Sequence, residues 1–361
     1  MAHAFGAGEP FRVGIEEEVF LVDPDHGHRL AHVAEAVVPA LGLPEGAAGF
    51  EAFASEVELR SPPCRTAVEA VEALVRDRAA VAAAGATALA AGLHPAGELG
   101  DARLVDEERY RRVGSELRGL LQRTPECALH VHVGMPDAET AIRVCNGLRT
   151  HLPLLAGLAA NSPFWFGRDS GMASARAALV RAYPGRGVPR AFRDFADYEG
   201  ELEATLRAAG MEDRTQLWWD VRPHPRLGTV EVREMDAQTD LRDALPLAAL
   251  VHCLARYEAE RAAPAGATAA ALSWSTFRAA RDGLDAGILD EDGSVRPLRE
   301  VARATLTRVT AIANELGATD ALEHVERILR EGGGSARQRA EHARTGMPGL
   351  LRSLAARTRG A

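Results

Sequence analysis

The sequence predicts an α+β fold in which antiparallel strands form a funnel-shaped sheet and the C-terminal part is mostly helical. Up to Glu234, short stretches rich in β-branched and aromatic residues alternate with clusters of Gly, Pro and Asp, as strands and turns do. From Asp240 to the end, over residues 240–361, apolar residues recur at helical spacing almost throughout. We find no internal repeat, and we expect residues 1–361 to form one domain with residues 1–10 as a loose terminus.

Length and composition exclude several classes of protein. The net charge of −9 argues against a general nucleic-acid binder, and no uncharged apolar run reaches the ~18 residues that a membrane span needs. The four cysteines lack CxxC spacing, which favours reduced thiols and a cytoplasmic location. All 42 basic residues are arginines, so no lysine can serve a Walker A loop or a Schiff base. If the protein handles phosphates, arginines and metal ions must bind them.

The first predicted strand, residues 13–22, carries three consecutive carboxylates. Side chains alternate between the faces of a strand, so Glu16 and Glu18 share one face while Glu17 points the other way. Two neighbouring carboxylates repel each other unless a cation lies between them or one stays protonated. A solvated edge strand is the alternative interpretation of this segment alone.

The same i, i+2 spacing recurs in three later strands, which argues against a simple edge strand. Each later pair combines acids, imidazoles or an acid with an arginine, separated by one apolar residue. The pairs are Glu56/Glu58, His130/His132 and Glu231/Arg233. If these strands share one sheet, one of its faces presents acids, imidazoles and an arginine together, which predicts a site for metal and phosphate.

The segments between the strands are expected to be helices and loops. Asp137 is a plausible N-cap for the helix that follows the His130/His132 strand. Residues 25–49 are expected to be a loop region with one short helix, and 332–334 a flexible joint before two short segments. The predicted helices are 66–91, 106–123, 137–160, 241–261, 274–285, 298–316 and 321–331.

Two loops and one hairpin complete the predicted order. Residues 161–171 mix glycines, aromatic residues and charges without periodicity, which is typical of a loop that closes over a bound molecule. Residues 184–189 form a second turn-rich loop. Residues 216–222 are predicted to be a strand, 223–228 the turn after it, and 228–234 its partner strand. Trp218 and Trp219 could stack on a nucleobase or pack in the core.

Carboxylate-rich sites with few imidazoles suit Mg²⁺ or Mn²⁺, which keep water and phosphate oxygens as further ligands. Zinc is less consistent with this ratio of ligands. Two or three such ions could bind a nucleoside triphosphate, with arginines neutralising the transferred group. The ligands would be Glu16, Glu18, Glu58, Glu231 and one of His130 and His132.

Several segments, in order, resemble the type-2 glutamate–cysteine ligase family, also called the carboxylate–amine ligase family. The resemblance extends from about residue 11 to 340, and the tryptophan-rich hairpin is its most diagnostic part. The matching segments are Gly14-Ile15-Glu16-Glu17-Glu18, His130-Val131-His132-Val133-Gly134, Ser162-Pro163-Phe164-Trp165 with Gly167-Arg168-Asp169, and Trp218-Trp219-Asp220-Val221-Arg222-Pro223-His224-Pro225 through Thr229-Val230-Glu231-Val232-Arg233.

The resemblance implies a glutamine-synthetase-like catalytic fold, commonly a homodimer, and ATP-dependent amide formation through an acyl-phosphate. It implies Mg²⁺ or Mn²⁺ as metal, with a small carboxylate such as glutamate and an amine as substrates. The implied metal ligands are Glu16, Glu18, Glu58, His130 and Glu231, with Glu51 as an addition. Arg233 and Glu58 would be catalytic together with Arg168, and Arg233 would contact phosphate. His132 would contact the nucleotide, and Ser162 and Arg222 the substrate or phosphate.

The sequence departs from the family pattern around the predicted metal centre. The family usually has Cys-Gly-Thr where this chain has Cys127-Ala128-Leu129, and the tyrosines common around residues 171–176 are missing. Cysteine is the expected amine by family name only. A metal-dependent guanidino-modifying or hydrolytic enzyme and a catalytically silent homologue therefore stay open as alternatives.

Overall fold

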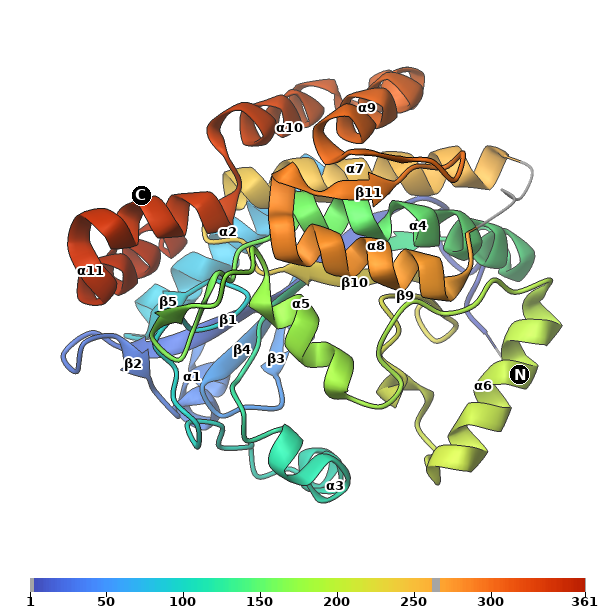
Figure 1. Cartoon of the computed structure of the whole chain (residues 1–361). Coiled ribbons are helices and arrows are strands. Elements are labelled where there is room, and N and C mark those ends of the chain that lie inside the picture. The colour runs from blue at the N-terminus through green and yellow to red at the C-terminus, as the bar shows by residue number, and fades with distance from the viewer. Residues whose placement is uncertain (1–2, 262–266, 361) are drawn as a thin grey trace.

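A computed structural model describes residues 3–261 and 267–360 (Figure 1). Its centre is an antiparallel sheet with the strand order β3-β4-β1-β6-β10-β9, in which β2 and β5 also pair with β1. Two small hairpins, β7–β8 and β11–β12, lie outside this sheet. The strands are β1 (Val13–Asp23), β2 (Arg29–Leu30), β3 (Ala48–Phe50), β4 (Glu56–Arg60), β5 (Thr87–Leu89), β6 (Ala128–Gly134), β7 (Phe164–Trp165), β8 (Arg168–Asp169), β9 (Val221–His224), β10 (Thr229–Asp236), β11 (Gly287–Leu289) and β12 (Val295–Pro297).

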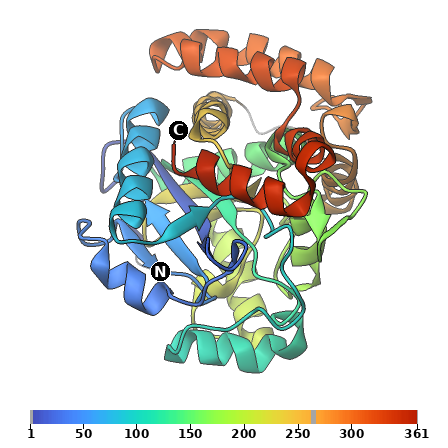
Figure 2. The ribbon, with the colours of Figure 1, turned by 90° about the vertical axis from the view of Figure 1, so that its left-hand side faces the viewer.

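Helices cover the sheet unequally. Figures 1 and 2 show α9 and α10 stacked outside α7, the sheet beneath them, and α3 and α6 on the opposite side. On the covered face, α2 packs on β1, α4 on β10 and α7 on β6. The helices are α1 (Ala34–Ala40), α2 (Ala67–Ala83), α3 (Glu108–Leu117), α4 (Ala138–Ala159), α5 (Ala175–Leu179), α6 (Phe195–Ala209), α7 (Leu241–Glu260), α8 (Ala269–Asp282), α9 (Leu298–Glu315), α10 (Thr319–Glu331) and α11 (Gly334–Thr358).

The alternation of side chains separates an apolar face of the sheet from a polar face. Ile15, Val131 and Val232 occupy neighbouring register positions on β1, β6 and β10, and all are buried in the main core. The residues between them carry the polar pairs. The apolar face of the sheet therefore packs on helices, while its polar face carries the charged groups.

Glu17 confirms this alternation, because it points into the apolar face away from its two neighbours. Its carboxylate is fully buried and accepts hydrogen bonds from the Arg78 guanidinium of α2, at 2.8 Å from Nε and 2.5 Å from Nη2. Arg78 also donates to the carbonyl oxygens of Gln238, Thr239 and Thr358. This buried ion pair joins the first strand to a helix and to two later segments of the chain.

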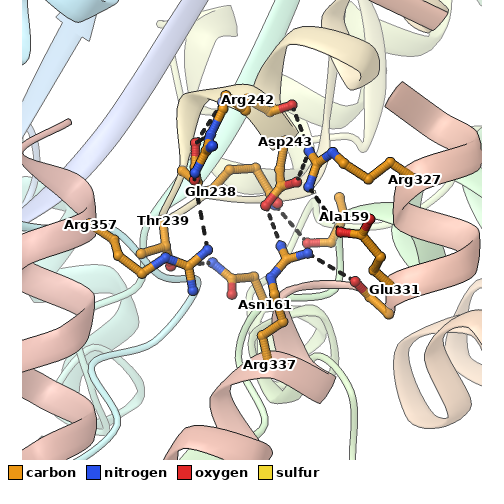
Figure 3. A network of polar contacts seen from close by, with 12 residues as sticks. Ala159, Asn161, Gln238, Thr239, Arg242, Asp243, Arg327, Glu331, Arg337 and Arg357 are labelled. Carbon is orange, nitrogen blue, oxygen red and sulfur yellow. Dashed lines mark hydrogen bonds and ion pairs between the residues drawn. The ribbon is translucent and has the colours of Figure 1, made fainter. Parts of the chain in front are cut away.

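A second polar network attaches the C-terminal helices to α7 (Figure 3). Asp243, in the first turn of α7, accepts a hydrogen bond from Arg327 of α10 at 2.7 Å and pairs with Arg337 of α11. Arg337 also donates to the carbonyl oxygen of Gly332 at 2.9 Å. Arg327 and Arg337, on either side of the predicted joint at residues 332–334, thus bind the same carboxylate.

Two predicted elements are wrong in their bounds. The helix expected over 66–91 ends at Ala83, and Gly85, with φ of 78°, turns the chain into β5, where Leu89 lies opposite Phe20 of β1. The strand expected over 216–222 begins only at Val221, and Pro223 lies inside it rather than in the turn. Proline is tolerated there because β9 is the last strand of the sheet and has one unpaired edge.

Other elements were not predicted. Helix α6, strand β3 and the hairpin β11–β12 have no counterpart in the sequence analysis, and the two expected C-terminal segments form α11, which is broken at Gly346 with φ of 68°. The described part of the expected loose terminus is also anchored. Phe5 is buried, and the Ala4 amide donates to the Pro225 carbonyl at 2.8 Å. Within the described residues, no helix combines the length and apolar character that crossing a membrane would require.

Asp77 should lower the stability of the protein above about pH 6. It is 7% exposed on α2, and its carboxylate makes no hydrogen bond or ion pair to a described residue. Burial, against the opposing charge of Arg76, raises its pKa to about 6. The folded state therefore binds this proton more tightly than the unfolded state, and stability is lost as pH rises through the folded pKa. Asp77→Asn should raise Tm by roughly 2–5 °C at pH 7.5 and hardly at pH 4.

Thermal unfolding of Asp77→Asn and of the exposed control Asp25→Asn, each at both pH values, tests this expectation. An equal gain for Asp77→Asn at pH 4 and pH 7.5 would show that the charge is not the cause.

Candidate active site

The register of the sheet brings the predicted polar pairs together on one face. Glu16 lies opposite His130 on one side and Arg60 on the other, and Glu18 lies opposite Glu58. On the far side of β6, His132 lies opposite Glu231, which in turn lies opposite Arg222. Because each pair is spaced i, i+2, these positions all lie on the same face.

A bulge in β10 adds two more charged groups to this side of the sheet. The register shifts between Val232 and Met235, so Arg233 and Glu234 together occupy the space opposite His130. Arg233 pairs with Glu231, and Glu234 accepts a hydrogen bond from Arg181 at 3.1 Å. An undistorted strand would have directed only one of these two neighbours to this side.

The carboxylates and imidazoles form two groups that could each hold a metal ion. One group consists of Glu16, His130 and Glu231 and the other of Glu18, Glu58 and His130, and within each group the ligand atoms lie within 4.8 Å of one another. His130 Nδ1 lies 3.4 Å from Glu16 and its Nε2 lies 3.6 Å from Glu18. The buried Nε2 has no hydrogen-bond partner among the described residues. This oxygen-rich donor set fits a hard divalent cation.

The electrostatics of the cluster also fit a bound cation. Burial, followed by the repulsion of Glu51, raises the pKa of Glu18 to about 8. Burial and the charges of Glu16 and Glu51 raise the pKa of Glu58 well above its ordinary value. Burial alone would also raise the pKa of Glu16, but the neighbouring His132 and His130 hold it well below the ordinary value. A bound divalent cation would let all of these carboxylates ionise together.

Two arginines bind the same carboxylate of the cluster. Arg222 Nε donates to Glu231 Oε2 at 2.7 Å, while Arg233 pairs with the other oxygen. The Arg222 guanidinium also donates to the carbonyl oxygens of Thr215 and Leu217. Arg233 therefore makes the ion pair with Glu231 that a purely structural role would require, and its buried Nε has no partner among the described residues.

The imidazole of His132 is oriented by a hydroxyl group. Its Nδ1 lies 3.0 Å from the hydroxyl oxygen of Thr229, so Nε2 faces Glu16 at 3.4 Å and Glu231 at 3.8 Å. Burial lowers the pKa of His132, but the two carboxylates outweigh it, so the pKa is raised. The predicted contact of His132 with a nucleotide stays a prediction.

Two cavities border the cluster, each at different residues. The outer cavity has a volume of about 340 Å³, includes Gly14, Gly134 and Gly228 in its walls, and reaches Glu16 and His132. The inner cavity is smaller, about 70 Å³, and reaches the cluster through Glu18 and Arg233. Its charged lining residues are Glu18, Glu51, Glu56, Glu126, Arg109, Arg176, Arg186 and Arg233. The cluster therefore has a cavity beside Glu16 and His132 and another beside Glu18 and Arg233.

The structure places two predicted residues away from these cavities. Ser162 is buried and donates to Asp236 at 2.7 Å, within a network that also binds Arg176. Arg168 is exposed on the hairpin β7–β8 and lines neither cavity. The same hairpin is attached to α11, because Arg339 binds both oxygens of Asp169 at 2.8 Å. The functional assignments of Ser162 and Arg168 and the predicted closing of this loop stay predictions.

The paired tryptophans have different surroundings. Trp219 packs near Phe192 and Tyr198, with ring centroids 5.7 and 6.4 Å away, as the core alternative expects. Trp218 lies at the wall of the inner cavity, beside Tyr183.

Several residues of the inner cavity were missed or left without a role. Glu56 had a signal, because it is spaced i, i+2 from Glu58. Glu126, Arg176 and Arg186 had none, since no periodic pattern connects them with the strands.

Known proteins resemble this chain over most of its length. Glutamate-cysteine ligase family 2 (GCS2) matches residues 12–356. A Rubrobacter xylanophilus protein named "Putative glutamate--cysteine ligase 2-1" is 38% identical over 93% of this chain and 91% of its own length. A Rhodospirillum rubrum protein named "Putative glutamate--cysteine ligase 2" is 34% identical over 96% and 92%.

Solved structures share the fold at low sequence identity. The glutamate–cysteine ligase of Francisella tularensis, crystallised with AMP, has a TM-score of 0.75 at 14% identity and covers 98% of this chain and 90% of its own. A bifunctional glutathione synthetase from Pasteurella multocida has a TM-score of 0.64 at 16% identity, covering 97% and 52%. The predicted α+β fold with an antiparallel sheet and a mostly helical C-terminal part is confirmed. The chain belongs to glutamate–cysteine ligase family 2.

Proposed function

We propose that the protein is an ATP-dependent carboxylate–amine ligase that uses Mg²⁺ or Mn²⁺ and forms an amide bond, with glutamate as the expected acid. The observation that carries this proposal is a cluster of carboxylates, imidazoles and arginines that borders two separate cavities. Membership of a glutamate–cysteine ligase family supports a C–N ligase, and the related Francisella tularensis enzyme was crystallised with AMP.

The nucleotide is assigned to the outer cavity. This cavity is the larger one, its glycines let a ligand approach the backbone closely, and Arg12 and Arg60 supply positive charge in its walls. Leu227, a half-exposed residue of its wall, gives it an apolar contact that suits a base. The triphosphate would then point toward Glu16 and His132. Metal ions held by Glu16, Glu18, Glu58, His130 and Glu231 would neutralise phosphate charge in this position.

The acid is assigned to the inner cavity, which Arg233 lines, and Arg233 would then lie between the acid and the triphosphate. The acid's carboxylate would attack the γ-phosphorus, which releases ADP and gives an acyl-phosphate. The amine would then attack the acyl carbon, so that the C–N bond forms, the C–O bond to phosphate breaks and one proton is released. The guanidinium of Arg233 would stabilise the phosphoryl oxygens, and the side chains around the inner cavity would keep water from the acyl-phosphate.

A coupled assay of ADP release, over a panel of acids and amines with Mg²⁺, tests the proposal. We expect ADP to form at a rate that depends on ATP, on one acid and on one amine, with stoichiometric amide product. ADP release that ignores the amine would favour a hydrolytic or guanidino-modifying enzyme. Nucleotide binding without any turnover would instead indicate a catalytically silent homologue.

A further inference from the structure

Four arginines line the inner cavity; Arg109 is exposed, and of the other three, two already have an anion. Arg176 Nε donates to Asp236 at 2.7 Å and its Nη2 to the carbonyl oxygen of Glu234 at 2.7 Å. Arg233 pairs with Glu231. The side chain of Arg186, by contrast, makes no hydrogen bond or ion pair to any residue that the structure describes, and its Nε is buried without a partner.

We propose that Arg186 binds the second anionic group of the acid substrate and thereby decides which acids are accepted. This inference rests on the proposed function, since it places the acid in the inner cavity. The acid would present its reacting carboxylate to Arg233 and its other carboxylate to Arg186. The substrate class would then be acids with two carboxylates.

The electrostatics of the cavity favour an anion beside Arg186. Burial, followed by the like charges of Arg233 and Arg176, lowers the pKa of Arg186 to about 10. The group is still protonated at neutral pH, and no described carboxylate makes an ion pair with the half-buried guanidinium. Glu126 is an acid in the same cavity, but its carboxylate accepts the hydroxyl of Tyr183 at 3.1 Å. A substrate carboxylate could instead make two parallel hydrogen bonds to the guanidinium.

The backbone around Arg186 holds it in a defined position. It lies in the turn-rich loop 184–189, where Gly187 has a φ of 121°, a conformation that disfavours other residues. The Gly187 carbonyl accepts a hydrogen bond from the Asp220 amide at 3.0 Å, directly before β9. The loop is therefore joined to the strand that carries Arg222, which fixes the backbone position of Arg186.

The test compares glutamate with 4-aminobutyrate, which is glutamate without its α-carboxylate. In the parent enzyme, kcat/KM should favour glutamate by at least roughly tenfold. Arg186→Gln should raise KM for glutamate by at least about tenfold, leave KM for ATP within about twofold, and remove the preference over 4-aminobutyrate. Arg186→Lys keeps the positive charge but loses the planar guanidinium, so its KM for glutamate should lie between those of the parent and of Arg186→Gln. Arg193→Gln, an exposed arginine outside both cavities, is the control.

Other results would overturn the assignment. If Arg186→Gln lowers the rate with both acids by the same factor, or if the preference survives, Arg186 does not bind the second carboxylate. If the parent enzyme releases no ADP, the proposed function fails. Titration calorimetry of glutamate in the presence of Mg²⁺ and ADP still tests whether Arg186 binds the second carboxylate. Glutamate binding that is lost in Arg186→Gln would support it, whereas equal binding or no binding by the parent would contradict it.

Discussion

Glu16→Gln should lower kcat for ligation by roughly a thousandfold while the protein stays folded. Glu16 lies between the two histidines of the cluster, 3.4 Å from each, and no arginine binds its carboxylate among the described contacts. Replacing the charged oxygen by an amide removes a candidate metal ligand without leaving a buried cation unpaired. The change should therefore act on metal binding and catalysis, with little effect on stability.

Three measurements separate these effects. The Mn²⁺ affinity, by titration calorimetry, should fall together with kcat, while Tm should stay within about 2 °C of the parent. Glu72→Gln on the exposed side of α2 is the control. Near-parental turnover of Glu16→Gln would refute the metal assignment. Glu231→Gln is less informative, because Glu231 binds Arg222 and Arg233 and its loss leaves two buried guanidinium groups without their carboxylate.

Arg233→Lys should lower kcat by roughly a hundredfold or more, with ATP affinity little changed. The lysine ammonium can keep the ion pair with Glu231, which is the structural role visible in the ion pair. It cannot supply the planar fork that binds two phosphoryl oxygens at once. The substitution therefore preserves the charge of the cluster and removes only the geometry that the transition state would use.

Steady-state kinetics, with ATP affinity measured separately, test this expectation against Arg303→Lys, an exposed pair partner of Glu326. If kcat of Arg233→Lys stays within about threefold of the parent, Arg233 only balances the charge of Glu231.

The polar composition of one face of the sheet could be predicted, because residues spaced i, i+2 in a strand lie on the same face. Which strands are neighbours could not be predicted from that spacing. Only the register shows that Glu16 lies opposite His130 and that Glu18 lies opposite Glu58. The bulge that directs both Arg233 and Glu234 to one side has no signature in the alternating pattern. The same limit hides Arg186, which reaches the cavity from a loop.

The errors in the fold have a related cause. Residues 84–91 continue an Ala-rich pattern that suits a helix, but pairing with β1 gives Leu89 a buried place opposite Phe20. Tertiary contacts of this kind outweigh local preference, which amounts to less than about 1 kcal/mol per residue. For Pro223 the error was the opposite one, because a residue of a strand was predicted to lie in a turn. A proline is tolerated in a strand only at an edge, and the sequence does not show the order of the strands.

The hydrogen bonds of Arg78 have a consequence for synthesis of the chain. Glu17 emerges from the ribosome early and Arg78 soon after, but the acceptors for the remaining guanidinium donors lie at Gln238, Thr239 and Thr358. The Ala90 amide also donates to the hydroxyl of Thr358 at 2.9 Å. In a nascent chain that ends before Thr358, a donor of Arg78 and the Ala90 amide, directly after β5, therefore lack their acceptors. The sheet that bears the cluster of carboxylates and imidazoles can reach its final stability only after translation has passed that threonine.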